Sequence, residues 1–173
     1  MKIFKFLVVL LLIFSTQSLS YKEDPEIEDK SGDTFSYLDI ISAWFYEESD
    51  YLCIAIKVVD LKIMLRTVYT VFWKYNEKDH HATMFVNIVG PLWMYGYFEE
   101  GIGWITKGTE GSYGLEEGII KIKIPKDEIG VQKGDRLTHT YAFSWQKIIF
   151  GWIPWFYDRA PDIGYGKDYV IQS

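Results

Sequence analysis

The sequence is poor in the residues on which disulfide and thiol chemistry depends. Its 173 residues include one cysteine, Cys53, so an internal disulfide cannot form. Cys53 stands between Leu52 and Ile54 in an apolar stretch, with no neighbouring cationic residue to lower the pKa of its thiol. We therefore predict that Cys53 is buried and unreactive, and that stability comes from the core or from a bound ion.

Catalytic motifs are also missing from the sequence. It contains no Gly-x-Ser-x-Gly, no His-Glu-x-x-His and no glycine-rich phosphate loop. Of the three histidines, His80 and His81 follow Asp79 in a polar stretch and are expected to be solvated at a turn, whereas His139 is expected to be a hydrogen-bonded core residue. No pair of carboxylates stands out as suited to glycoside hydrolysis. The chain is therefore predicted not to be an enzyme.

Long apolar runs are limited to residues 6–14 (FLVVLLLIF), which follow Lys2 and Lys5 and precede the small, polar residues 15–20. This order is typical of a signal peptide over residues 1–20, with cleavage after Ser20. An uncleaved N-terminal anchor is the alternative, although the run is shorter than the about 20 apolar residues that span a bilayer. We expect a protein that is secreted or associated with the cell surface, and that can contact a membrane without spanning it.

Positive charge is scarce. Lys and Arg number 18 against 24 Asp and Glu, and removal of residues 1–20 takes away two lysines and no acids, which leaves a net charge of −8. Nucleic-acid binding requires a basic face, so this balance argues against a nucleic-acid partner. It is compatible with divalent cations and with neutral ligands such as sugars.

What the sequence does contain is a hydrophobic period of two, which begins after an acidic stretch over residues 21–35 that we expect to be a flexible leader. About eight or nine short strands are expected, at residues 36–46, 51–59, 67–75, 81–89, 92–98, 102–106, 119–124, 137–145 and 168–172. Short strands with frequent turns predict an all-β fold, namely an antiparallel β-sandwich, immunoglobulin-like or jelly-roll-like, over residues 36–173. A single closed sheet is the alternative.

Aromatic residues make up 18% of the chain, about twice an ordinary share. Most of them must fill the core, and we expect Tyr141, Phe143 and Trp145 to share a core-facing side of strand 137–145 with Leu137 and His139. Aromatic rings also stack on the apolar faces of sugar rings. The residues expected to be exposed and to bind a ligand are Trp93, Tyr95, Trp104, Trp152 and Trp155.

Residues 148–157 (IIFGWIPWFY) form an unusual segment, because the loop-forming Gly151 and Pro154 stand among eight apolar or aromatic residues. Loops normally lie on the surface. The segment therefore either folds back onto the sandwich as a plug or exposes an apolar patch to a partner or a membrane. Both interpretations stay open.

Carboxylates form the third group of candidates, and the residues singled out as metal ligands are Asp33, Asp39, Asp158 and Asp162. Asp39 lies inside an apolar strand, where an unpaired carboxylate is costly. One interpretation is that Asp39 pairs with Arg159 or faces water at an edge. The other is that these carboxylates bind calcium, which prefers hard oxygen ligands gathered from loops.

Short motifs spread over residues 29–172 resemble those of a known group of extracellular modules. They are Asp29-x-x-Gly32-Asp33, Asp39-Ile40, Val58-Val59-Asp60-Leu61, Tyr69 to Trp73, Ile124-Pro125-Lys126, Ile129-Gly130, Gly134-Asp135, Asp158-x-Ala160-Pro161-Asp162-x-Gly164-x-Gly166 and Tyr169-Val170. In these motifs the chain resembles the DOMON-like superfamily, which includes family-nine carbohydrate-binding modules and the glucodextranase-type C-terminal domain. The resemblance implies a β-sandwich that is a non-catalytic module, with sugars, haem or calcium as ligands.

Three functional hypotheses follow. The first is an extracellular module that binds a glycan or another cell-surface component, with calcium as the cofactor to be tested. The second is a structural or adhesive surface protein that self-associates through residues 148–157. The third is a haem domain; Met84, Met94 and His139 are residue types that could be axial ligands, but nothing in the sequence pairs them across a pocket.

Overall fold

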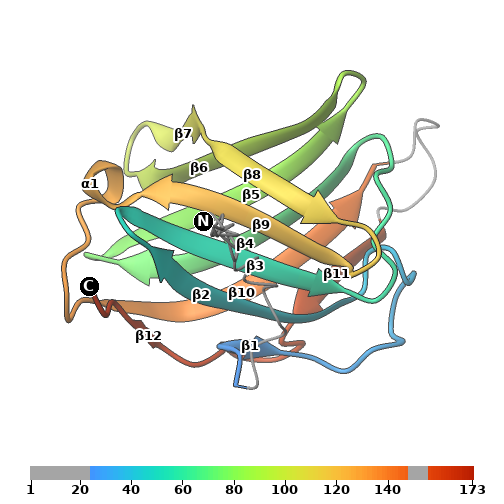
Figure 1. The fold of residues 1–173 in the computed structure, drawn as a ribbon, viewed down its shortest axis with the longest axis horizontal. Coiled ribbons are helices and arrows are strands. Elements are labelled where there is room, and N and C mark those ends of the chain that lie inside the picture. The colour runs from blue at the N-terminus through green and yellow to red at the C-terminus, as the bar shows by residue number, and fades with distance from the viewer. Residues whose placement is uncertain (1–23, 148–155) are drawn as a thin grey trace, which may run out of the picture.

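The computed structural model describes residues 24–147 and 156–173. In these residues the chain forms two antiparallel sheets packed face to face (Figure 1). The first sheet has the order β1-β2-β3-β9-β8. Its strands are β1 (Ile27–Glu28), β2 (Ile40–Glu48), β3 (Tyr51–Val58), β9 (Ile119–Pro125) and β8 (Glu110–Gly114). The prediction of an all-β antiparallel sandwich is confirmed.

The second sheet has the order β11-β10-β4-β5-β6-β7, and β12 adds to it by pairing with β10. Its strands are β11 (Phe156–Ala160), β10 (Arg136–Gln146), β4 (Thr67–Tyr75), β5 (Lys78–Asn87), β6 (Gly90–Glu99), β7 (Gly103–Gly108) and β12 (Tyr169–Val170). The one helix in the described residues is the single turn α1 (Lys126–Ile129). Within those ranges no helix has the length and apolar character needed to cross a membrane.

The core lies between the two sheets and follows the period-two pattern of the sequence. From the first sheet, Leu52, Ile54 and Ile56 on β3 point inward, as the alternation predicts. From the second sheet, the inward side chains of β4 are Tyr69, Val71, Trp73 and Tyr75. Cys53 is fully buried and free, and burial raises the pKa of its thiol to about 11, so the prediction of a buried thiol is confirmed.

Part of the acidic stretch expected to be a flexible leader belongs to the sandwich instead. Ile27 pairs with Ala43 of β2 and is fully buried, and the Glu26 carboxylate accepts a hydrogen bond from the Phe45 backbone amide at 2.9 Å. The acidic composition hides this strand, because a single apolar residue is enough to fix a two-residue edge strand when its side chain enters the core. The remaining predicted boundary, at residue 20, lies outside the described residues.

A β-bulge in β10 decides what the outer face of the second sheet presents. The pairing of β10 with β4 shifts between Thr138 and Tyr141, and His139 has a φ of 52°. Leu137 points into the core before the bulge, but beyond it the inward residues are Thr140, Ala142 and Ser144, so the aromatic side chains point outward. The expectation that Tyr141, Phe143 and Trp145 face the core is wrong, because one extra residue in a strand exchanges its two faces.

Candidate functional site

The outer face of the second sheet carries a continuous group of aromatic rings, which we call the aromatic face. Its members come from five strands and from the segment after β11, and they are Phe72, His81, Phe98, Trp104, Tyr141 and Tyr165. Phe72 on β4 is central to it: its ring stacks on Tyr141 with centroids 4.9 Å apart and lies 5.9 Å from the ring of Trp104. The face exists because these strands alternate large outward and inward residues.

A hollow of about 250 Å³ opens on the aromatic face. The residues that line it are aromatic or polar, namely Phe72, Trp73, Trp104, Tyr141, Tyr165, His139, Lys74 and Asp79. Lys74 and Asp79 form an exposed ion pair with a separation of 3.9 Å between nitrogen and oxygen. An apolar surface with a few charged or hydrogen-bonding groups at its rim is the usual composition of a small-ligand site.

Positive charge lies against one end of this hollow. The Arg159 guanidinium stands 4.9 Å from the centroid of the Tyr141 ring, within the range of a cation–π contact, and donates hydrogen bonds to the carbonyls of Pro161 and Gly164. These contacts tie the segment after β11 to the aromatic face. Tyr165 on this segment then lies edge-on to His139, at 4.7 Å between centroids.

His81 packs against Trp104, one of the residues that line the hollow. Its two ring nitrogens lie 2.9 Å from the hydroxyl of Thr83 and 3.3 Å from that of Thr106, and its ring packs against the edge of Trp104. Burial lowers the pKa of His81 to about 4, so the imidazole is neutral at neutral pH. The tight packing requires glycine at position 96, where a Cβ would stand 2.9 Å from the imidazole and closer still to the Ile105 carbonyl.

Of the aromatics predicted from sequence as exposed ligand contacts, Trp104 alone among those described lies on the aromatic face, where its side chain is 48% exposed. Tyr95 is 5% exposed and belongs to the core, and Trp93 packs against the core. Both are corrections: β6 turns these two residues inward, and its outward residues are Leu92, Met94 and Phe98. Trp152 and Trp155 lie outside the described residues.

Sequence reasoning missed Phe72, Tyr141 and Tyr165 as candidate ligand contacts. Phe72 was obscured because β4 is apolar on both faces, and Tyr141 because the bulge at His139 cannot be recognised from residue types. The small residues that alternate with the aromatics of β10 are buried, and the hydroxyls of Thr140 and Ser144 donate hydrogen bonds to the carbonyls of Lys167 and Leu38. Tyr165 follows no strand pattern at all.

The expected environments of the histidines are reversed. His80 and His81 are buried within β5, and the ring of His80 stacks on Trp73 with centroids 5.6 Å apart. His139 is exposed and its Nδ1 lies 3.0 Å from the hydroxyl of Thr138. Met84 is fully buried in the core, so it does not share a pocket with His139, and this pair offers no haem site.

A second candidate site is a cluster of carboxylates at the end of the sandwich where β2 begins and β11 ends. Asp33, Asp39 and Asp158 each offer an oxygen, and these oxygens lie within 4.8 Å of one another. Asp29, Asp33 and Asp162 form an overlapping group with the same spacing. The structure therefore brings together all four carboxylates predicted as metal ligands and adds Asp29.

The electrostatics of this acidic cluster are unfavourable for the protein alone. Burial, together with the neighbouring carboxylates of Asp33, Asp29 and Asp39, raises the pKa of Asp158 to about 7. Burial likewise raises the pKa of Asp39. Asp39 does not pair with Arg159, because the Arg159 guanidinium lies over Tyr141 on the other side of β11.

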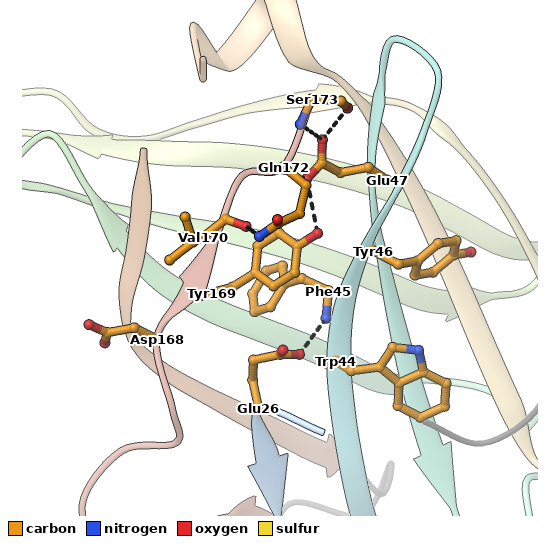
Figure 2. A pocket seen from close by; sticks show the side chains of 10 residues that line it. All are labelled: Glu26, Trp44, Phe45, Tyr46, Glu47, Asp168, Tyr169, Val170, Gln172 and Ser173. Atoms are coloured by element: carbon orange, nitrogen blue, oxygen red, sulfur yellow. Dashed lines mark hydrogen bonds between the residues drawn. The ribbon is translucent and has the colours of Figure 1, made fainter. Parts of the chain in front are cut away.

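A shallow groove next to the C-terminus is less suited to a ligand (Figure 2). Its central charge, Glu47, already accepts hydrogen bonds from the chain itself: from the backbone amides of Gln172 at 2.6 Å and Ser173 at 3.1 Å, and from the Tyr169 hydroxyl at 3.0 Å. Lys126 adds an ion pair at 2.6 Å. Figure 2 shows the Glu47 carboxylate directed at the terminal residues, so its role is to hold the C-terminal segment in place.

Comparison of the chain with protein-family models, with curated proteins and with solved structures gave no match.

Proposed function

We propose that the protein is a secreted, non-catalytic binding module that binds carbohydrate on the aromatic face. The observation that carries the proposal is the hollow between Trp104, Phe72 and Tyr141, with Lys74 and Asp79 at its rim. Trp104 is the most exposed of the three, at 48%, and the faces of its ring carry partial negative charge, which attracts the weakly positive C–H groups on the apolar face of a sugar ring. The rim groups supply donors and acceptors for the sugar hydroxyls.

The size of the hollow favours one sugar unit of a longer chain. The hollow of about 250 Å³ is smaller than the roughly 300–1,000 Å³ of sites that enclose a whole drug-sized ligand. The rings continue beyond it along the sheet, because Phe143 on β10 stacks on Tyr157 of β11 at 5.7 Å. This band would accept neighbouring sugar units of an extended, neutral oligosaccharide.

Binding without catalysis is supported by the carboxylates at the hollow. Asp79 is the one carboxylate among the described residues that line it, and it is exposed and paired with Lys74. Hydrolysis of a glycoside in the usual way requires two carboxyl groups, one on each side of the bond to be broken. Among the described residues, the hollow offers groups suited to holding a sugar but one carboxyl group where cleavage uses two, which supports binding without catalysis.

Titration with a panel of soluble and insoluble glycans, followed by tryptophan fluorescence and calorimetry, tests the proposal. We expect a glycan that binds the wild type and binds Trp104→Ala at least about tenfold more weakly, a loss of about 1.4 kcal/mol. The matched control is Tyr113→Ala, because Tyr113 on β8 is 42% exposed but belongs to the other sheet. No binding across the panel, or equal loss in both variants, would contradict the proposal.

A further inference from the structure

We propose that Asp33, Asp39 and Asp158, with Asp29 and Asp162 beside them, form a calcium-binding site. The first support is geometric. Calcium binds oxygen ligands at about 2.3–2.6 Å, so two ligands on opposite sides of the ion are at most about 5 Å apart. The oxygens offered by Asp33, Asp39 and Asp158 lie within 4.8 Å of one another, which places all three within reach of one ion.

The second support is a buried carboxylate oxygen that has no partner. Asp39 is 2% exposed; its Oδ2 accepts a hydrogen bond from the Gly32 amide at 2.7 Å, while its Oδ1 is shielded from solvent and makes no hydrogen bond. Asp158 is 4% exposed and its Oδ2 is likewise bound by a backbone amide, that of Ile40, at 2.7 Å. The amides thus orient the carboxylates and leave Asp39 Oδ1 available to the cluster.

The third support is the cost of the cluster without a cation. Buried charges require a partner of opposite charge, and several carboxylates at this spacing repel one another. Within residues 24–147 and 156–173 none of the five aspartates forms an ion pair with Lys, Arg or His. A divalent cation supplies the missing charge and also the missing partner for Asp39 Oδ1 (and for Asp29 Oδ2, which is buried and unpartnered as well).

The donor set selects the metal. All five side chains offer hard oxygen atoms, and the cluster contains no histidine or cysteine, the ligands that zinc and copper prefer. The ligands come from the segment between β1 and β2, from the strand β11 and from the segment after it, which is an irregular set. Calcium tolerates such geometry with six to eight oxygens, whereas magnesium requires a nearly regular octahedron.

The site also explains how two distant parts of the chain are held together. In Figure 1 the blue segment between β1 and β2 runs beside the red strand β11, and the hydrogen bond between Ile40 and Asp158 joins residues 118 positions apart. An ion bound by ligands from both segments is bound by the folded state and not by the unfolded chain. It therefore stabilises the fold by mass action, in a chain that has no second cysteine for a disulfide.

Calcium titration of the full chain after removal of metal with EGTA and dialysis tests the inference, and it requires no glycan. We expect calorimetry to show one calcium site, and the melting temperature to rise by on the order of 10 °C when calcium exceeds its Kd a thousandfold. Magnesium at the same concentration should have a much smaller effect. If calcium produces neither heat nor a shift in melting temperature, the site does not exist, whatever the outcome of the glycan panel.

Two variants separate a calcium ligand from a merely structural carboxylate. Asp158→Asn keeps an oxygen for the Ile40 amide but removes a buried charge, so without calcium it should melt at a higher temperature than the wild type, and calcium should no longer shift it. Asp127→Asn, which changes an exposed carboxylate on α1, should respond to calcium as the wild type does. An undiminished calcium response in Asp158→Asn would overturn the assignment. If that variant fails to fold, calorimetry on the wild type decides whether the calcium site exists.

Discussion

At the scale of single residues, the properties of this protein depend on polar groups whose environment the fold determines. Glu47 is the clearest case. Burial opposes its charge, but the hydrogen bonds from the Gln172 amide, Lys126, Ser173 and Tyr169 outweigh that effect and lower its pKa from 4.5 to about 2. The carboxylate is thus a fixed anion that binds the last residues of the chain.

The sign of the resulting pH dependence follows from this shift. Because the pKa of Glu47 is lower in the folded than in the unfolded chain, its contribution to stability is complete above about pH 4.5 and is lost as the pH falls toward 2. Glu47→Gln should therefore lower the free energy of unfolding by about 2 kcal/mol at pH 7 and flatten its decline between pH 4.5 and 2. Urea denaturation as a function of pH measures both effects.

The comparison for that experiment is Glu99→Gln. Glu99 forms a surface ion pair with Lys78, and such pairs contribute about 0–1 kcal/mol. A loss in Glu47→Gln no larger than that in Glu99→Gln would show that the C-terminal segment is not held by this carboxylate.

At the scale of structural elements, β11 and the segment after it connect the two candidate sites. Asp158 and Asp162 belong to the acidic cluster, whereas Arg159 and Tyr165 lie on the aromatic face. Arg159 also donates hydrogen bonds to the carbonyls of Pro161 and Gly164, which fixes the segment between them. We therefore expect that restraining the acidic cluster also restrains the edge of the hollow, because fewer than ten residues of chain separate the two.

Hydrogen exchange measures this connection without a glycan. We expect calcium to slow amide exchange in residues 158–167, because the ion restrains Asp158 and Asp162, and to leave exchange in β5 and β6 unchanged. Asp158→Asn should abolish the calcium-dependent protection. Equal slowing throughout the sandwich would instead indicate general stabilisation, and no change in residues 158–167 would show that the two sites are independent.

The same elements show how far the sequence predicts the structure. The strict alternation of Ile120, Ile122 and Ile124 identifies β9 almost to the residue, and the polar interruptions between strands identify most of the rest. The acidic cluster was also predictable, since an aspartate within an apolar strand requires a partner. The aromatic face was not, because it depends on the bulge at His139, which reverses the faces of β10 while leaving its pattern of residues unchanged.

At the scale of the whole molecule, the sandwich separates its tasks between its surfaces. The interior between the sheets holds the fold, the end where β2 begins carries the acidic cluster, and the outer side of the second sheet carries the aromatic face. On these proposals, a chain with one cysteine would combine a cation for stability with an exposed row of rings for binding. The first sheet, which contributes β8 and Tyr113, has no part in the proposed glycan contact.

The most direct test of this account records the indole N–H signals of the tryptophans in a proton–nitrogen correlation spectrum while a glycan from the panel is added. The signal of Trp104 is identified by its absence in Trp104→Phe. We predict that it shifts with the glycan concentration, while the signal of Trp44, which is buried on β2 of the first sheet, stays in place. A glycan that binds and shifts other indole signals but leaves that of Trp104 unmoved would contradict carbohydrate binding on the aromatic face.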